Sequence, residues 1–301
     1  MGLESVYIVV GLTLVIYAIM TVRDKHHKRR WGTSLFWLLY GCSFIFGSIL
    51  PDFVIGLMVI ILTIIAATGM LGSGFYQPSS DEEKKQRARQ FGNKLFIPAA
   101  VIPIVTFLWA KLMGNALEGL GIASMVALAV TLAMTRGSIE SSFQQGRRQL
   151  DAIGWAAILS QFLAALGYLF GAADVGSTVS TIVAAMVNQS SQLATVAAYC
   201  LGMAAFTVIL GNTFAAFAVI TAGIGIPMVI VTHGGDPAIV GVLGMLSGYC
   251  GTLLTPMAAN FNVVPAALLE LDNKYHVVKV QAIPALALLL ANIILMYTLA
   301  F

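Results

Sequence analysis

The residues with the greatest chemical potential lie in the stretch GYCGTLLTPMAANFNVVPAALLE, residues 248–270. Its helix-breaking and hydrogen-bonding residues are Gly251, Thr252, Thr255, Pro256, Asn260 and Asn262. The flanking sequence is apolar enough for a membrane interior, where an unpaired backbone N–H or C=O is costly. Non-helical backbone at that depth survives only when it is buried in protein or lines a wet cavity. Threonine and asparagine side chains supply partners for such backbone, and they equally supply ligands.

Similar residues interrupt the preceding segments. The short apolar piece 177–187 ends before Asn188 and Ser190, and the longer run 193–210 ends at Gly211-Asn212-Thr213. A half-helix N-terminus offers free N–H groups and partial positive charge to a carboxylate, whereas unwound carbonyls and Asn or Thr oxygens suit a cation. We therefore predict a discontinuous-helix site for a small anion and a cation. The predicted substrate or ion residues are Asn188, Ser190, Asn212, Thr213, Gly251, Thr252, Thr255, Pro256, Asn260 and Asn262, with sodium at Asn212, Thr213, Thr252 and Thr255. The alternative is that these residues only kink and pack helices.

Composition assigns the class. Of 301 residues, 59% are apolar and 10% charged, and the mean hydropathy is +0.90. A soluble domain of this length needs more charged residues to cover its core. We expect an all-α polytopic membrane protein with about nine or ten hydrophobic segments, including discontinuous or re-entrant helices in the C-terminal half. Expected spans include residues 6–22, 34–50, 53–71, 96–111, 120–134, 154–170 and 282–299.

The loop charges predict the orientation. Residues 23–30, 79–94 and 136–151 hold five, five and three of the 16 Lys and Arg residues. The intervening turns hold almost none. This alternation predicts that the N-terminus lies outside. The expected location, a bacterial cytoplasmic (inner) membrane, does not follow from these charges.

The chain reads as one integral membrane domain. Residues 1–150 are expected to form scaffold helices, and residues 151–301 the substrate-binding region. The charged stretch 77–93 is the candidate boundary, a solvated connector containing a short surface helix.

Motifs for other chemistry are absent from the sequence. The three cysteines are scattered, and His26 and His27 fall in a basic loop. No HExxH, GxSxG or phosphate-binding loop is present. We expect no enzyme activity, no resident cofactor or metal, and no nucleic-acid partner. Because Asp52, Asp174, Asp236 and His233 fall at predicted span ends, neutral oxygen ligands and sodium coupling are favoured over a proton relay.

The segments GNTFAAFAVITAGIGIP (211–227) and SGYCGTLLTPMAANFNVVPAALLEL (247–271) resemble one subunit of the two-component 5-oxoproline (pyroglutamate) transporter family. The resemblance extends to GRRQLDAIGWAAILSQFLAALG (146–167). It implies a second polytopic membrane subunit and import of a small cyclic amide bearing a carboxylate. The break CGTLLTPMAANFN is also similar in style to those of the wider ion-transporter superfamily, where paired re-entrant hairpins hold an anion and sodium and move as an elevator. Those folds hold two inverted halves, whereas this chain shows one dense break region. The other half would then come either from the partner subunit or from a second copy of this chain in a homodimer.

Three hypotheses remain at this point. The first is a transport subunit that binds a small organic carboxylate. The second is a non-transporting membrane scaffold or assembly subunit whose breaks serve helix packing. The third, an intramembrane hydrolase, has little support in the sequence.

Overall fold

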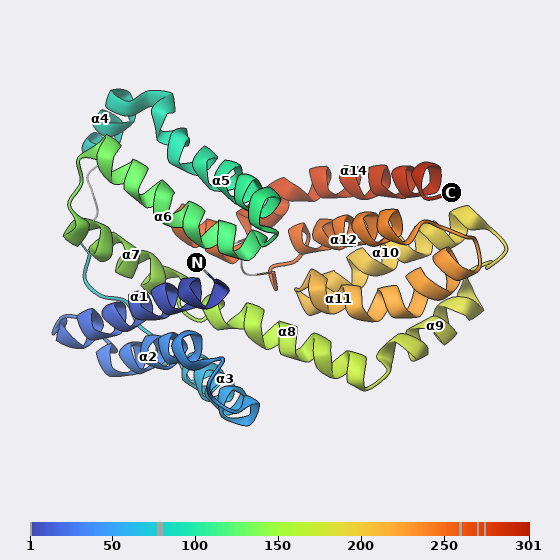
Figure 1. Ribbon diagram of the computed structural model, residues 1–301, viewed down its shortest axis with the longest axis horizontal. Helices are drawn as coiled ribbons and strands as arrows, with labels where there is room; N and C mark the ends of the chain where they lie inside the picture. Colours follow the sequence, from blue (N-terminus) through green and yellow to red (C-terminus); the bar gives the residue numbers. More distant parts are fainter. Residues whose placement is uncertain (1, 77–80, 259–260, 270, 274) are drawn as a thin grey trace. The chain divides into compact units, whose positions relative to one another are not determined.

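The computed structural model of the chain describes residues 2–76, 81–258, 261–269, 271–273 and 275–301 (Figure 1). Every regular element within those ranges is a helix. The chain divides into two compact units, Met1–Gly154 and Trp155–Phe301.

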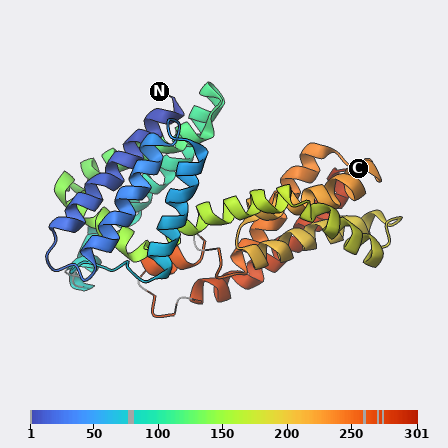
Figure 2. The same ribbon diagram turned by 90° about the horizontal axis from the view of Figure 1, so that it is seen from below.

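The first unit contains two hairpin-like helix pairs and an amphipathic helix. Its elements are α1 (Leu3–Arg23), α2 (Arg30–Phe46), α3 (Asp52–Ala67), α4 (Asp81–Phe91), the 3₁₀ helix η1 (Gly92–Phe96), α5 (Ile97–Met113), α6 (Ala116–Thr135) and α7 (Ile139–Ile153). Figures 1 and 2 show α1 beside α2, and α5 beside α6. Glycine lets α1 and α2 approach closely at Gly11, where an added Cβ would lie only 2.7 Å from the Gly41 carbonyl oxygen. The charged α4 confirms the short helix predicted within the connector.

The second unit is a bundle interrupted by breaks. Its elements are α8 (Ala156–Ala172), α9 (Val175–Met186), α10 (Gln192–Leu210), α11 (Thr213–Ile220), the π-helix η2 (Thr221–Val231), α12 (Pro237–Leu253), α13 (Val263–Leu268) and α14 (His276–Leu299). The fully buried Tyr199 of α10 lies at the centre of its core. Its hydroxyl lies 2.9 Å from Thr221 Oγ1, and Gly225 and Gly244 leave room for the ring.

Helix lengths and hydropathy support a multi-pass membrane protein. Among the described residues, six helices are long and apolar enough to cross a membrane. They are Leu3–Arg23, Ala88–Met113, Ala116–Thr135, Gln192–Leu210, Thr213–Val231 and His276–Leu299. The bent pair α7–α8 would make a seventh, and α3, α9 and α12 are shorter apolar helices. The prediction of an all-α polytopic protein is confirmed.

One detail of the predicted spans needs correction. The segment predicted at 34–50 is the 17-residue α2, which begins four residues earlier and ends at Phe46 in a turn before Pro51. It is therefore too short to count among the six long helices. The break between α7 and α8 falls just inside the predicted C-terminal half 151–301, because Gly154 (φ +51°) ends α7.

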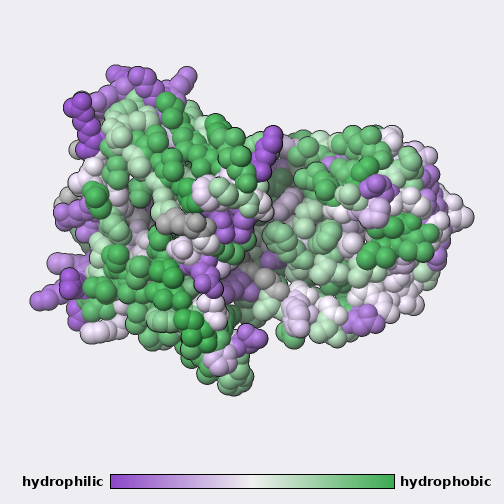
Figure 3. Space-filling model, viewed as in Figure 1, coloured by the Kyte–Doolittle hydropathy of each residue, from purple (hydrophilic) through white to green (hydrophobic). Residues whose placement is uncertain are grey.

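The helix surfaces are those of a lipid-exposed protein. Large apolar side chains such as Phe53, Leu112 and Ile283 are more than three-quarters exposed. Figure 3 shows hydrophobic side chains over broad areas of the visible face, with hydrophilic ones at its edges and in smaller patches between them. Apolar surface of this extent is stable only in contact with lipid or another apolar partner.

Candidate functional site: two helix breaks that meet

The first break separates α10 from α11. Gly211 adopts a left-handed conformation (φ +72°), which glycine tolerates because it has no Cβ, and its N–H donates to the Thr207 carbonyl at 2.7 Å. Asn212 then caps α11, with its Oδ1 accepting from the N–H groups of Phe214 (2.8 Å) and Ala215 (3.3 Å). The Asn212 side-chain oxygen therefore satisfies α11 itself.

The second break follows α12. The chain leaves the helix after Leu253, and Thr255 Oγ1 accepts from the Met257 N–H at 3.3 Å. The buried Asn262 bridges the unwound end, because its Nδ2 donates to the carbonyl oxygens of Thr252 (2.8 Å) and Thr255 (2.7 Å). One amide group thus satisfies two carbonyls that the end of the helix left unpaired.

The two breaks lie against each other. A Cβ on Gly211 would come within 2.6 Å of Met257 Cβ and 2.8 Å of its carbonyl oxygen. On α12, a Cβ on Gly248 would collide with Thr213 Cγ2, and one on Gly251 would collide with the Ala204 carbonyl oxygen. Glycines therefore let α10, α11 and α12 approach at backbone distance, a packing that membrane helices commonly use.

Three buried oxygens in this region have no hydrogen-bond partner among the described residues, which do not include 259 and 260. They are Thr207 Oγ1, Thr213 Oγ1 and Asn262 Oδ1, on residues that are 0%, 2% and 0% exposed. The two threonines share a contact region, since a Cβ on Gly248 would meet Thr207 Oγ1 at 3.4 Å as well as Thr213 Cγ2. Buried polar atoms in folded proteins are nearly always paired, so three unpaired oxygens beside two breaks are an exception that needs an explanation.

These oxygens are neutral, and this limits their chemistry. Hydroxyl and amide oxygens are ligands for hard cations, and a hydroxyl also donates to a carboxylate. Within the described ranges, no cluster of three or more His, Cys, Asp or Glu side chains is arranged to hold a metal ion. The arrangement suits a weakly held monovalent cation or a small polar ligand better than a transition metal.

The other predicted residues are placed less centrally. Asn188 and Ser190 are exposed and hydrogen-bond to each other at 2.6 Å in the turn before α10, roughly 28 Å along that helix from the first break. Thr252 Oγ1 donates to the Tyr249 carbonyl at 2.6 Å, and Pro256 is exposed. Asn260 lies outside the described residues.

Sequence reasoning missed Thr207. A threonine in an apolar run usually bonds to the carbonyl four residues earlier, as Thr63 and Thr131 do at 2.8 and 2.7 Å. Thr207 makes no such bond. The feature of the sequence that could have pointed to Thr207 is its position four residues before Gly211, where the helix ends.

An apolar cavity of about 310 Å³ lies beside the first break, between α8 and α11. Gly167, Phe214 and Ala215 are among its lining residues, and Phe214 also contacts the Tyr249 ring edge-on at 6.5 Å between centroids. This cavity gives the break region apolar space on the side of α11 that faces α8.

Sequence reasoning also missed a buried charged cluster in the first unit. We define it as Asp24, His27, Tyr76, Arg147 and Asp151. His27, expected as a basic-loop residue, is buried, with Nε2 3.3 Å from Asp151 Oδ2. Arg147 Nη2 lies 2.9 Å from Asp24 Oδ2, and the Tyr76 hydroxyl donates to Asp151 at 2.5 Å. The residues come from three separate segments, so no local pattern pointed to them.

The electrostatics of this cluster favour the charged form of Asp24. Although partial burial opposes it, the hydrogen bond from the His26 N–H and the nearby Arg147 guanidinium hold the pKa of Asp24 below its usual range. Burial and the hydrogen bond to Asp151 raise the pKa of Tyr76. Since His27 Nδ1 accepts the Arg29 N–H at 3.2 Å, its proton sits on Nε2, toward Asp151.

Comparison with known proteins identifies a family. A family model described as "Protein of unknown function (DUF979)" matches residues 4–301. The chain belongs to this family. No curated protein and no solved structure matches the DUF979 chain significantly.

Proposed function

We propose that this DUF979 protein is a secondary-transporter subunit that imports a small organic anion. The supporting observation is the meeting of two helix breaks around the unpartnered oxygens of Thr207, Thr213 and Asn262. Transporters use broken helices in this way because exposed helix ends bind ions without placing a charged side chain in the membrane.

The break segments resemble a family that transports 5-oxoproline, and we therefore propose 5-oxoproline as the substrate. This molecule has a carboxylate, a ring N–H, a carbonyl and a small apolar ring. The threonine hydroxyls can donate to the carboxylate, and the apolar cavity beside α11 offers space of the right character for the ring. Carbonyls at the ends of α10 and α12 favour a cation, and sodium is the coupling ion we propose over a proton.

The resemblance also implies a second polytopic membrane subunit and a bacterial inner-membrane location. One dense break region in this chain supports that arrangement, because the second half of an inverted pair would come from the partner. Co-purification of the two subunits from membranes that contain both directly tests this proposed association.

Valine replacements test the transport proposal. Thr207→Val and Thr213→Val remove a hydroxyl while keeping the side-chain shape. Because neither hydroxyl has a protein partner, folding stability should stay the same or rise slightly. Uptake of labelled 5-oxoproline by cells expressing both subunits should fall roughly tenfold or more, the equivalent of one lost hydrogen bond to a charged group.

Thr195→Val is the matched control. Thr195 is equally buried on α10, but its hydroxyl is hydrogen-bonded to the Gln192 carbonyl at 2.9 Å. It should lower stability slightly and leave uptake unchanged in protein that reaches the membrane. Unchanged uptake in both test variants would remove the site assignment.

A non-transporting scaffold is the second candidate. It is favoured by the self-contained hydrogen bonding of Asn212 and Asn262, which closes both breaks without a ligand. In that case purified wild-type protein assembled with its partner would bind no labelled 5-oxoproline with or without sodium, and the valine variants would behave like wild type.

A further inference from the structure

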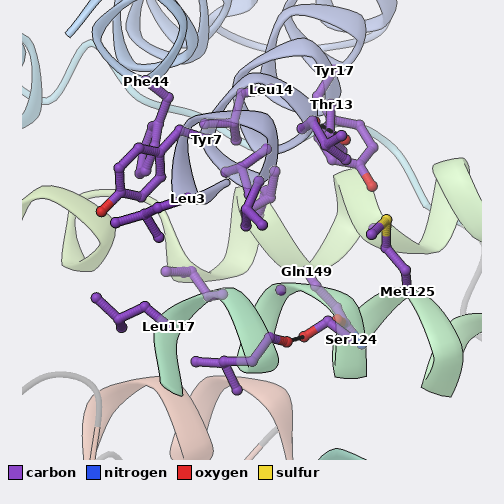
Figure 4. A pocket seen from close by; sticks show the side chains of 18 residues that line it. Leu3, Tyr7, Thr13, Leu14, Tyr17, Phe44, Leu117, Ser124, Met125 and Gln149 are labelled. Atoms are coloured by element: carbon purple, nitrogen blue, oxygen red, sulfur yellow. Dashed lines mark hydrogen bonds between the residues drawn. The ribbon is translucent and has the colours of Figure 1, made fainter. Parts of the chain in front are cut away.

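An elongated apolar cleft of about 560 Å³ runs along α1 in the first unit. Its wall on α1 consists of Leu3, Val6, Tyr7, Val9, Val10, Thr13, Leu14 and Tyr17, which mostly follow the three-to-four-residue spacing of one helix face. Figure 4 shows these side chains facing others from α6, such as Leu117 and Met125, across the cleft. The cleft therefore lies between α1 on one side and α6 and α7 on the other, and these helices touch α1 where Gly121 meets Val6 and Gly146 meets Tyr17.

The few hydroxyls on this wall do not make it polar. Thr13 Oγ1 donates to the Val9 carbonyl, and Ser124 Oγ donates to the Leu120 carbonyl, each at 2.8 Å. Both groups are satisfied within their own helices. Tyr7, Tyr17 and Gln149 carry the other polar groups of the lining, so the cleft presents a mainly hydrocarbon surface to its occupant.

A second cavity of about 310 Å³ lies at the last turn of α1, past the end of the cleft, and is polar. It is lined by Met20, Arg23, Asp24, Gln144 and Arg147. Met20 lies three residues beyond Tyr17, so the polar cavity follows the apolar cleft along the helix. Arg147 is nine-tenths buried and its Nε has no partner, while its terminal nitrogens contact Asp24 and the Met20 carbonyl.

The charges at this end favour an anion. Arg147 neutralises Asp24 at 2.9 Å, which leaves the exposed Arg23 as the net charge of the lining. Lys25 and Lys28 follow in the same loop. Basic pockets at the ends of membrane helices bind anionic lipid headgroups for this reason.

The dimensions distinguish a lipid chain from a helix. From Leu3 to Tyr17 the cleft is about 21 Å long at the helical rise. A helix is about 10 Å across with its side chains, and none fits between α1 and α6 where a Cβ added to Gly121 would already collide with the Val6 side chain. A single hydrocarbon chain, whose carbons lie about 4 Å from the wall atoms, needs much less room.

We propose that the first unit binds an anionic phospholipid, with one acyl chain in the cleft along α1 and its phosphate beside Arg23 and Arg147. Because α1 has 21 residues, about the hydrocarbon thickness of a bilayer, Arg23 lies at the level of the headgroups. The site is independent of the helix breaks and of the transported substrate.

Native mass spectrometry of the purified chain tests this proposal. The protein is equilibrated with equal amounts of phosphatidylglycerol and phosphatidylcholine carrying the same acyl chains. Wild type should retain phosphatidylglycerol at least fivefold more than phosphatidylcholine. Arg23→Gln should abolish this preference, whereas Lys25→Gln, an exposed charge in the same loop that does not line the cavity, should preserve it.

Variants that fill the cleft test the acyl chain. Val10→Trp and Ser124→Trp fill it from α1 and from α6, and each should reduce retention of both lipids at least fivefold. Ile8→Trp, an exposed position on α1 outside the cleft, is the matched control and should change nothing. Variants are compared only at unchanged melting temperature.

Several results would overturn the proposal. Equal retention of the two lipids by wild type, or full retention by both cleft-filling variants, contradicts it. Displacement of the lipid by millimolar inorganic phosphate would indicate an anion site without an acyl chain. Cross-linking of Val10→Cys to a helix of the partner subunit, in place of lipid, would assign the cleft to protein.

Discussion

The charged cluster of the first unit and the helix breaks of the second are built from different polar groups. In the charged cluster, both Asp24 and Asp151 have cationic or hydrogen-bonding partners from distant segments. At the breaks, every described polar side chain is neutral. Among the described residues both regions keep buried atoms without a partner, which are Arg147 Nε and Asp151 Oδ1 in the cluster and the hydroxyls of Thr207 and Thr213 at the breaks. The chain therefore uses ion pairs to fix loops and neutral oxygens where its helices unwind.

Physical cost explains the division. A charge left unpaired in a low-dielectric region is far more costly than an unpaired hydroxyl. In a site that binds and releases a ligand, neutral groups are therefore tolerated, because leaving them unpaired costs little free energy when the ligand dissociates. Charged groups are tolerated in ion pairs within the protein, because both partners stay in place. Four measurements test this contrast.

The largest expected effect is at Arg147. Arg147→Met leaves Asp24 without its cation in a mostly buried position and should lower the free energy of unfolding by about 3 kcal/mol. Thermal unfolding in detergent measures the loss. Lys28→Met removes an exposed charge from the loop that holds Asp24 and should leave the unfolding free energy almost unchanged. Equal effects of the two substitutions would mean that the charged cluster does not stabilise the unit.

Asn262 should come next. Asn262→Ala leaves the carbonyls of Thr252 and Thr255 without their donor and should cost about 2 kcal/mol in unfolding free energy. Asn188→Ala, at an exposed turn, should cost less than about 1 kcal/mol. The same thermal assay compares them, and a neutral Asn262→Ala would show that the second break needs no internal clamp.

Gly251 tests how closely the helices must approach. Its Cβ would collide with the Ala204 carbonyl, so Gly251→Ala should destabilise by roughly 1–3 kcal/mol. Gly241→Ala lies on the same helix with no atom within 4 Å of the added Cβ, and it should stabilise by up to about 1 kcal/mol. We therefore expect changes in unfolding free energy of opposite sign at two positions of one helix. If both substitutions stabilise the protein, α12 does not pack closely against α10 at Gly251.

The smallest effect is the acid sensitivity of Asp24. Its folded pKa lies below the ordinary value of 3.8, so its ion pair contributes fully above about pH 4 and is lost as the pH falls through the folded pKa. Melting temperatures measured from pH 7 to pH 3 should therefore fall less steeply at the acid end for Asp24→Asn than for wild type. The breaks, which carry no carboxylate, should contribute nothing to this slope.

Much of the architecture followed from composition and local pattern. The apolar runs predicted the membrane helices, since hydrocarbon requires both length and hydropathy. The Gly-Asn-Thr and Thr-Pro signals predicted where α10 and α12 end, because left-handed glycine, an asparagine cap and proline act within a few residues. The resemblance to a transporter subunit rests on those same segments, and the binding-site prediction stays a prediction.

Long-range contacts decided what local pattern did not determine. The sequence could not show that Gly211 meets Met257, that Asn262 turns back to Thr252 and Thr255, or that Thr207 has an unpartnered hydroxyl. Nor could it show that His27 lies buried against Asp151, more than a hundred residues away. A residue's own neighbours set its backbone preference, but whether its polar atoms find a partner depends on which distant segments pack against it.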